Sequence, residues 1–96
     1  MLEQKVQLEE AIESIDHLCN QMVNQENYQK DLPECVGKIN IAMSILLNDP
    51  MIHSPLLLQL LQDMMSGIEN QDEVLLLDVL RFGMRFILKD YMELLA

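Results

Sequence analysis

The amino-acid sequence predicts an all-α fold, an antiparallel four-helix bundle with up-down-up-down connections. Apolar residues recur at alternating spacings of three and four, which is the repeat of one helix face. The apolar half of the chain is aliphatic and includes eight methionines, with only two tyrosines and two phenylalanines. Three glycines and three prolines leave little material for the turns of an all-β fold. The alternative for this single domain, residues 1–96, is a three-helix core with one appended helix.

The first predicted helix spans residues 2–24, where neither glycine nor proline interrupts the pattern. Its apolar stripe follows the spacing of four, three, four and three and comprises Leu8, Ile12, Ile15, Cys19 and Met22. Three acids, Glu9, Glu13 and Asp16, lie beside this stripe on one flank. The segment therefore predicts an amphipathic helix with an acidic edge.

The start of the second helix has two interpretations. Asp31 followed by Glu34 is typical of a capping box, with Pro33 tolerated in the first turn. The rival interpretation is a longer helix from Asn27, kinked at Pro33. In both, the helix ends before Pro50, because the residue preceding a proline is disfavoured in the α region. The apolar stripe comprises Leu32, Val36, Ile39, Met43 and Leu46.

Two further start signals place the third and fourth helices. Ser54 and Pro55 put a capping residue before a proline at the first helical position. Residues 70–73, Asn-Gln-Asp-Glu, predict a second capping box, which starts a helix over residues 71–95. Since the connections are short, neighbouring helices are expected to be antiparallel.

The fourth predicted helix is apolar on more than one side. One stripe comprises Leu77, Leu80, Met84, Leu88, Tyr91 and Leu95. At about 100° per residue, a second group falls nearly opposite and comprises Leu75, Val79, Phe82 and Phe86. Gly83 lies beside this second group, where its missing side chain would permit close helix approach.

A helix at the rim of a monomeric bundle needs only one apolar stripe. We therefore expect a partner surface on the fourth helix, used most simply in a homodimer and otherwise for a helical protein partner. That surface comprises Leu75, Val79, Phe82, Gly83 and Phe86. The alternative is a central fourth helix, all of whose faces meet helices of the same chain.

The only basic cluster recurs every four residues along the fourth helix, at Arg81, Arg85 and Lys89. The structural interpretation is a charged seam in which these residues face the acids of the first helix, Glu9, Glu13 and Asp16. The functional interpretation is a grip on an acidic partner peptide.

The net charge of −10, from sixteen acids and six bases, limits the classes of partner. Such a chain repels polyanions, so we expect no nucleic acid and no membrane partner. Cys19 and Cys35 form no CxxC motif and lie on apolar helix faces, which indicates buried, reduced cysteines. With no signal-peptide pattern at the start, the sequence favours a soluble, cytoplasmic protein.

No residue pattern predicts an active site. The serines are explained as caps or helix-surface residues, and the isolated glycines form no phosphate-binding loop. Neither His17 nor His53 has a glutamate three residues before it, the spacing used in carboxylate-bridged metal bundles. We therefore expect no enzyme activity, catalytic residue, metal, cofactor or small-molecule substrate.

The stretch IENQDEVLLLDVL, residues 68–80, and the earlier pair Asn27-Tyr28 resemble a pattern in small acidic helical proteins of Firmicutes. The expected architecture is similar to flagellin-type export chaperones, antiparallel bundles that wrap secreted helices. This resemblance implies a non-catalytic helical protein–protein interaction module, in its concrete form an export-chaperone-like or co-chaperone adaptor. The alternative is an acidic regulatory protein that sequesters a basic partner.

Overall fold

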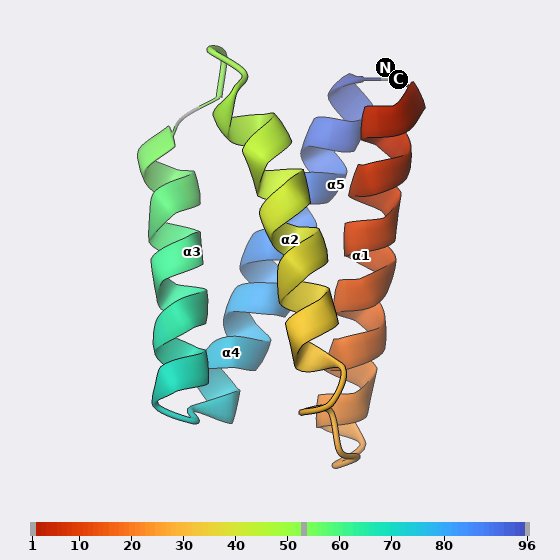
Figure 1. Cartoon of the computed structure of the whole chain (residues 1–96). Helices are drawn as coiled ribbons and strands as arrows, with labels where there is room; N and C mark the ends of the chain where they lie inside the picture. The colour runs from red at the N-terminus through yellow and green to blue at the C-terminus, as the bar shows by residue number, and fades with distance from the viewer. Residues whose placement is uncertain (1, 53, 96) are drawn as a thin grey trace.

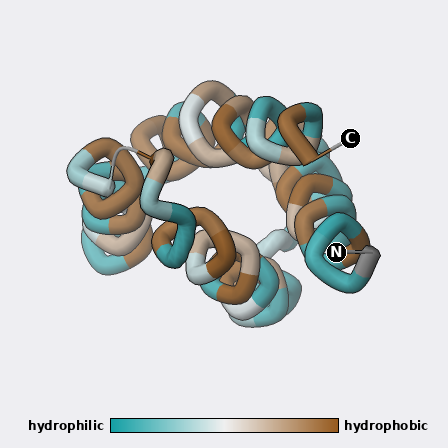
Figure 2. The backbone as a smooth tube through the Cα atoms, turned by 90° about the horizontal axis from the view of Figure 1, so that it is seen from above, coloured by the Kyte–Doolittle hydropathy of each residue, from teal (hydrophilic) through white to brown (hydrophobic). Residues whose placement is uncertain are grey.

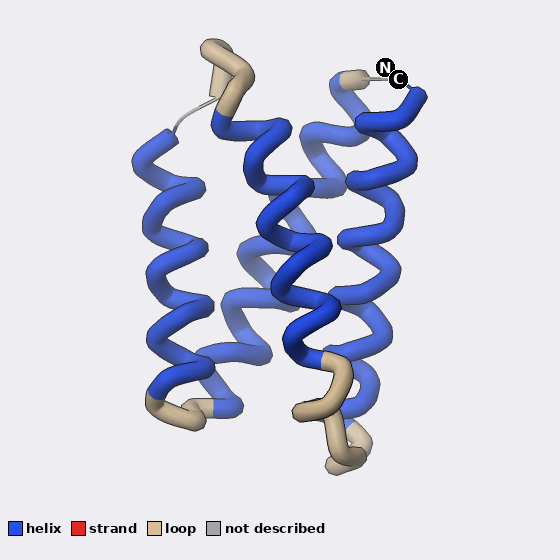
Figure 3. The backbone as a smooth tube through the Cα atoms, in the orientation of Figure 1, coloured by secondary structure: helices blue, strands red, loops and turns tan. Residues whose placement is uncertain are grey.

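Four antiparallel helices form the chain in the computed structural model, which describes residues 2–52 and 54–95 (Figure 1). α1 spans Leu2–Val23, α2 spans Leu32–Leu47 and α3 spans Ser54–Glu69. The fourth helix runs without a break through α4 (Glu73–Asp78), η1 (Val79–Met84) and α5 (Arg85–Leu94). Short loops join the helices at alternating ends, and the described residues contain no strand (Figure 3). The predicted four-helix bundle is confirmed.

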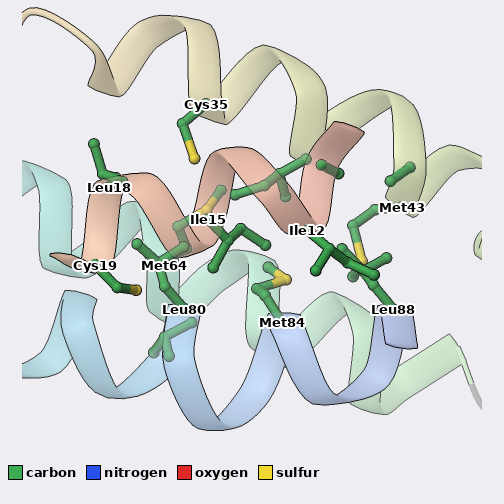
Figure 4. Close-up of a cluster of buried hydrophobic side chains, with 14 of the residues drawn as sticks. Ile12, Ile15, Leu18, Cys19, Cys35, Met43, Met64, Leu80, Met84 and Leu88 are labelled. Atoms are coloured by element: carbon green, nitrogen blue, oxygen red, sulfur yellow. The ribbon is translucent and has the colours of Figure 1, made fainter. Parts of the chain in front are cut away.

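The helices stand around one shared apolar core, seen from above in Figure 2. α1 packs against α2 on one side and against η1 and α5 on the other, whereas α3 packs mainly on α4 and η1. All four helices contribute to the core, and α3 contributes Leu57 and Met64. The predicted stripes supply most of its fully buried side chains, among them Ile15, Met43 and Leu88 (Figure 4), whereas Leu18 and Cys35, also fully buried, lie outside them. None of the helices among the described residues is both long and apolar enough to cross a membrane.

The starts of α2 and α4 correct two details of the prediction. α2 begins at Leu32, as the start at Asp31 requires, but the Asp31 side chain caps nothing. Its Oδ2 instead accepts a hydrogen bond from Nε2 of Gln21, 2.9 Å away on α1. At α4 the cap is Asp72, whose Oδ1 accepts from the backbone N–H of Leu75 at 3.1 Å. The predicted cap at Asn70 is wrong because Gln71 adopts a left-handed backbone (φ 52°), so the helix starts only at Glu73.

Two tyrosines make contacts at the connections between helices, at opposite ends of the bundle. Tyr28, between α1 and α2, is buried beside Glu73, and both burial and this carboxylate raise the pKa of its hydroxyl. At the other end, Tyr91 donates to Oδ2 of Asp49 at 2.7 Å, while Oδ1 of Asp49 accepts from the N–H of Met51 at 2.9 Å. These two bonds lower the pKa of Asp49, and the bond to Asp49 raises the pKa of Tyr91.

η1 is a π-helical turn that the periodicity analysis missed. The N–H of Arg85 donates to the carbonyl of Leu80, five residues earlier. The buried residues of this helix include Leu76, Leu80, Met84 and Leu88, each four positions after the last. In a regular α-helix every such step rotates the side chain by about 40°, so the stripe would drift away from the core. The wider π turn absorbs this drift and keeps the stripe on the core.

Two residues of the predicted partner surface pack within the chain. Val79 is buried, 7% exposed, because it lies three positions after the buried Leu76 and therefore on the same side of the helix. A Cβ atom at Gly83 would lie 2.5 Å from Cδ2 of Leu60, so this glycine serves the close approach of α3. The expectation that Val79 and Gly83 face a partner is therefore wrong.

Candidate docking groove

An open groove of about 580 Å³ lies between α1 and the fourth helix. One wall belongs to α1 and consists of Asp16, Cys19, Asn20 and Val23. The other wall belongs to η1 and α5 and consists of Arg81, Phe82, Arg85 and Phe86. We refer to these eight residues as the arginine–phenylalanine groove. It combines the two phenylalanines, which we call the apolar ridge, with two cations and one acid on adjacent helices.

The apolar ridge of the groove is unusually exposed. The side chains of Phe82 and Phe86, four residues apart, are 69% and 64% exposed, and Val23 on the opposite wall is 55% exposed. Burying a side chain as large as phenylalanine stabilises by roughly 1.5–3 kcal/mol relative to exposure. Of the predicted partner surface, Phe82 and Phe86 are thus open to solvent, whereas Leu75 is half-buried against the core.

The two arginines of the groove have different surroundings. Nε of Arg85 donates to Oδ1 of Asp16 at 2.6 Å, an ion pair that ties α5 to α1. The guanidinium of Arg81 lies 5.6 Å from the centre of the Phe82 ring, within the range of a cation–π interaction. Among the ion pairs of residues 2–52 and 54–95, none involves Arg81 or Lys89. The groove therefore carries cationic charge that the described part of the chain does not neutralise.

The predicted charged seam forms only at one pair. Asp16 and Arg85 meet, but no ion pair in the described part of the chain joins Glu9 or Glu13 to the basic row. Glu13 instead lines a second groove, on the side of α1 that faces α2. These acids, although on one flank, thus lie between two grooves, with Glu13 at the α2 side and Asp16 paired on the α5 side.

The cysteine of the arginine–phenylalanine groove, Cys19, is a poor nucleophile at neutral pH. Burial, assisted by the nearby Asp16 carboxylate, raises the pKa of the Cys19 thiol to about 11, so the thiol is protonated at neutral pH. Cys35 is also buried and free, and burial raises its pKa as well. Figure 4 shows the two thiols on different sides of α1. Their predicted burial is confirmed.

The second groove, between α1 and α2, is smaller, at about 290 Å³, and mostly acidic. Its charged and polar lining residues are Glu10, Glu13, Ser14, His17, Asp31, Glu34 and Lys38. Lys38 Nζ lies 3.5 Å from Oε1 of Glu34, and His17 Nε2 lies 3.9 Å from Oδ2 of Asp31. Across residues 2–52 and 54–95, no three histidine, cysteine or acidic side chains are grouped so as to hold a metal ion. His53 lies outside the described residues.

The groove was only partly predictable from the sequence. Phe82, Phe86 and the arginines follow from the second apolar side and the basic row of the fourth helix. Asn20 and Val23 were missed, and the one available signal is that Val23 is apolar yet lies off the stripe of the first helix. No protein-family model, curated protein or solved structure matches this chain.

Proposed function

We propose that this chain is a non-catalytic helical protein–protein interaction module that binds a partner helix in the arginine–phenylalanine groove. The observation that carries the proposal is the pair of neighbouring phenylalanines, each about two-thirds exposed, beside a groove formed by two helices. A groove between helices suits the mode in which an amphipathic helix lays its apolar side chains between two others. An export-chaperone-like or co-chaperone adaptor is the concrete form of this function.

The π turn adds independent support for a binding role. η1 holds Phe82 at the groove, and π-helical turns are rare and occur frequently at functional sites. Catalysis receives no support from the groove lining, since its thiol is protonated at neutral pH and no histidine lines this groove to act as a base. The groove offers contact surface rather than reactive groups.

Sequestration of a basic partner, the alternative function, would use the acidic groove between α1 and α2. There two of the four lining acids are engaged by the chain itself, whereas Glu10 and Glu13 form no ion pair among the described residues. Glu34 pairs with Lys38, and Asp31 accepts from Gln21 and lies near His17. That groove keeps two carboxylates for a cationic partner, but its one apolar lining residue, Leu18, is buried, so it offers no exposed apolar surface comparable to Phe82 and Phe86.

Selection from a displayed library of helical peptides tests the proposed function. We expect wild-type protein to select amphipathic helices whose binding is lost in the Phe82→Ser/Phe86→Ser double variant. Ile41→Ser is the matched control, because Ile41 on α2 is half exposed but lies outside the groove. A library that yields no binders, or binders that ignore the double substitution, contradicts the proposal.

Self-association is the other use of the same surface. Light scattering of wild type and Phe82→Glu separates the two cases. If the wild type is a dimer and Phe82→Glu dissociates it, the phenylalanines bind a second copy of the chain, as the homodimer hypothesis requires. A monomer in both proteins would remove that hypothesis and leave the groove open for a different chain.

A further inference from the structure

We infer that the arginine–phenylalanine groove selects a partner helix with an acidic flank, in which carboxylates face Arg81, Arg85 and Lys89 while apolar residues pack on the phenylalanines. This inference rests on the proposed function and specifies the chemistry of the partner. It names a different protein chain, not a second copy of this one.

The row of cations is the first argument. Arg81, Arg85 and Lys89 follow one another at every fourth position, and Arg81 and Arg85 line the groove itself. Arg81 is exposed, has no ion-pair partner among the described residues and lies over the Phe82 ring. Because the ring holds the guanidinium beside the apolar ridge, one ligand helix can meet both the ridge and the cations.

Charge balance at the groove argues against a second copy as the occupant. Each groove carries two arginines against the single carboxylate of Asp16. Two copies meeting groove to groove would bring these like charges together, which disfavours association. A helix with an acidic flank would neutralise the same charges. The overall charge of −10 does not prevent this, since at physiological salt charges farther apart than about 8 Å are largely screened.

A charge-swap experiment tests the inference by fluorescence anisotropy at about 0.15 M salt. The scaffold is a groove-binding helix from the peptide selection, made in three versions with Glu, Gln or Lys along the flank beside its apolar face. Wild-type protein should bind the Glu version about tenfold more tightly than the Gln version, because each of the three cations contributes about twofold, and it should bind the Lys version more weakly still. Arg81→Glu should narrow or reverse this preference.

Lys38→Glu is the matched control, because it makes the same charge change in the other groove. It should leave the order of affinities unchanged. If all three peptides bind equally and Arg81→Glu has no effect, the acidic-flank inference is overturned while the docking module stands. A dimer dissociated by Phe82→Glu also overturns it, and a selection without groove binders removes the proposed function along with it.

Discussion

The two grooves beside α1 share one helix and differ in the kind of group that the chain leaves without a partner. On the α2 side, carboxylates meet a lysine, a histidine and an amide of the same chain. On the α5 side, one arginine is paired, a second lies on a phenylalanine ring, and two phenylalanines are left in solvent. Since Glu10 and Glu13 on the α2 side also form no ion pair among the described residues, exposed apolar surface, and not unpaired charge, is what distinguishes the α5 side as the candidate site.

The largest expected contrast between the two sides of α1 is in stability. Leu18 is fully buried and lies under the acidic groove, so Leu18→Ala should lower the free energy of unfolding by about 2–5 kcal/mol. Phe82→Ala on the other side should change it by no more than about 0.5 kcal/mol, because that side chain is mostly exposed. Urea unfolding of both variants measures this. Equal losses would mean that the phenylalanine ridge is part of the core, and the comparison would fail.

Thiol labelling distinguishes the two sides by reaction rate. In single-cysteine variants, Cys19 at the groove should react with iodoacetamide faster than Cys35, which is almost fully buried. Since the thiolate is the reactive form and the pKa of Cys19 is about 11, its rate should rise about tenfold per pH unit between pH 7 and 10. Mass spectrometry over time gives both rates. Faster labelling of Cys35, or a rate for Cys19 independent of pH, would contradict the assigned environment of the groove.

The Tyr91–Asp49 hydrogen bond should contribute to the stability of the fold but not to peptide binding. Tyr91→Phe should lower the thermal midpoint at neutral pH without changing peptide affinity, because neither residue lines the groove. The pKa of Asp49 is lowered on folding, so its contribution is present above its ordinary pKa of 3.8 and is lost as the pH falls below that value. The pKa of Tyr91 is raised, so the stabilisation also fades as the pH rises above 10.

Thermal unfolding of wild type and Tyr91→Phe across this range should therefore show a difference in midpoint at neutral pH that shrinks at both extremes. A constant difference from pH 2 to 11 would show that the bond does not depend on the ionised Asp49.

The smallest expected effect concerns the ion pair that joins the two walls of the groove. A double-mutant cycle with Asp16→Ala and Arg85→Ala should give a coupling of about 0.2–1 kcal/mol, because both side chains are partly exposed. Arg81→Ala combined with Asp16→Ala should show less coupling, since Arg81 is not paired with Asp16 in the described structure. Denaturant titrations supply the values. A stronger coupling of Asp16 with Arg81 than with Arg85 would mean that Arg81, and not Arg85, forms the ion pair with Asp16.

The sequence predicted the helices better than it predicted their ends. Stripes with alternating spacing predicted most of the buried core, because burial of one face imposes that pattern, but they missed Leu18, Ala42 and Leu76. The caps were less predictable. Asp31 and Asp72 are equally good capping residues in a local pattern, yet Asp31 bonds to Gln21 of a distant helix while Asp72 caps α4. Gln21, a residue of another helix, determines that Asp31 does not cap α2, and the residues next to Asp31 in the sequence carry no information about this contact.

The candidate site shows the same division between local and tertiary information. An excess of apolar residues on the fourth helix correctly indicated that some of them remain in solvent, as Phe82 and Phe86 do. Rotation at a fixed 100° per residue placed Val79 beside them, whereas the wider turn of η1, which begins at Val79, increases the angle between them, and Val79 is buried three positions after Leu76. The repeated spacing of four from Leu76 to Leu88 was the available sign, since a regular helix does not hold that spacing on one face.

The π turn implies that the chain carries one residue more than the architecture of its last helix demands. With one position fewer between Leu80 and Met84, the buried series would read four, three, four, and an ordinary α-helix would serve. The three intervening residues include Phe82, which contributes little to the interior and much to the surface. An insertion of this kind enlarges a contact surface while the surrounding helices keep their places. The register of a helix, and not only its composition, thus determines which side chains are exposed for contact with other molecules.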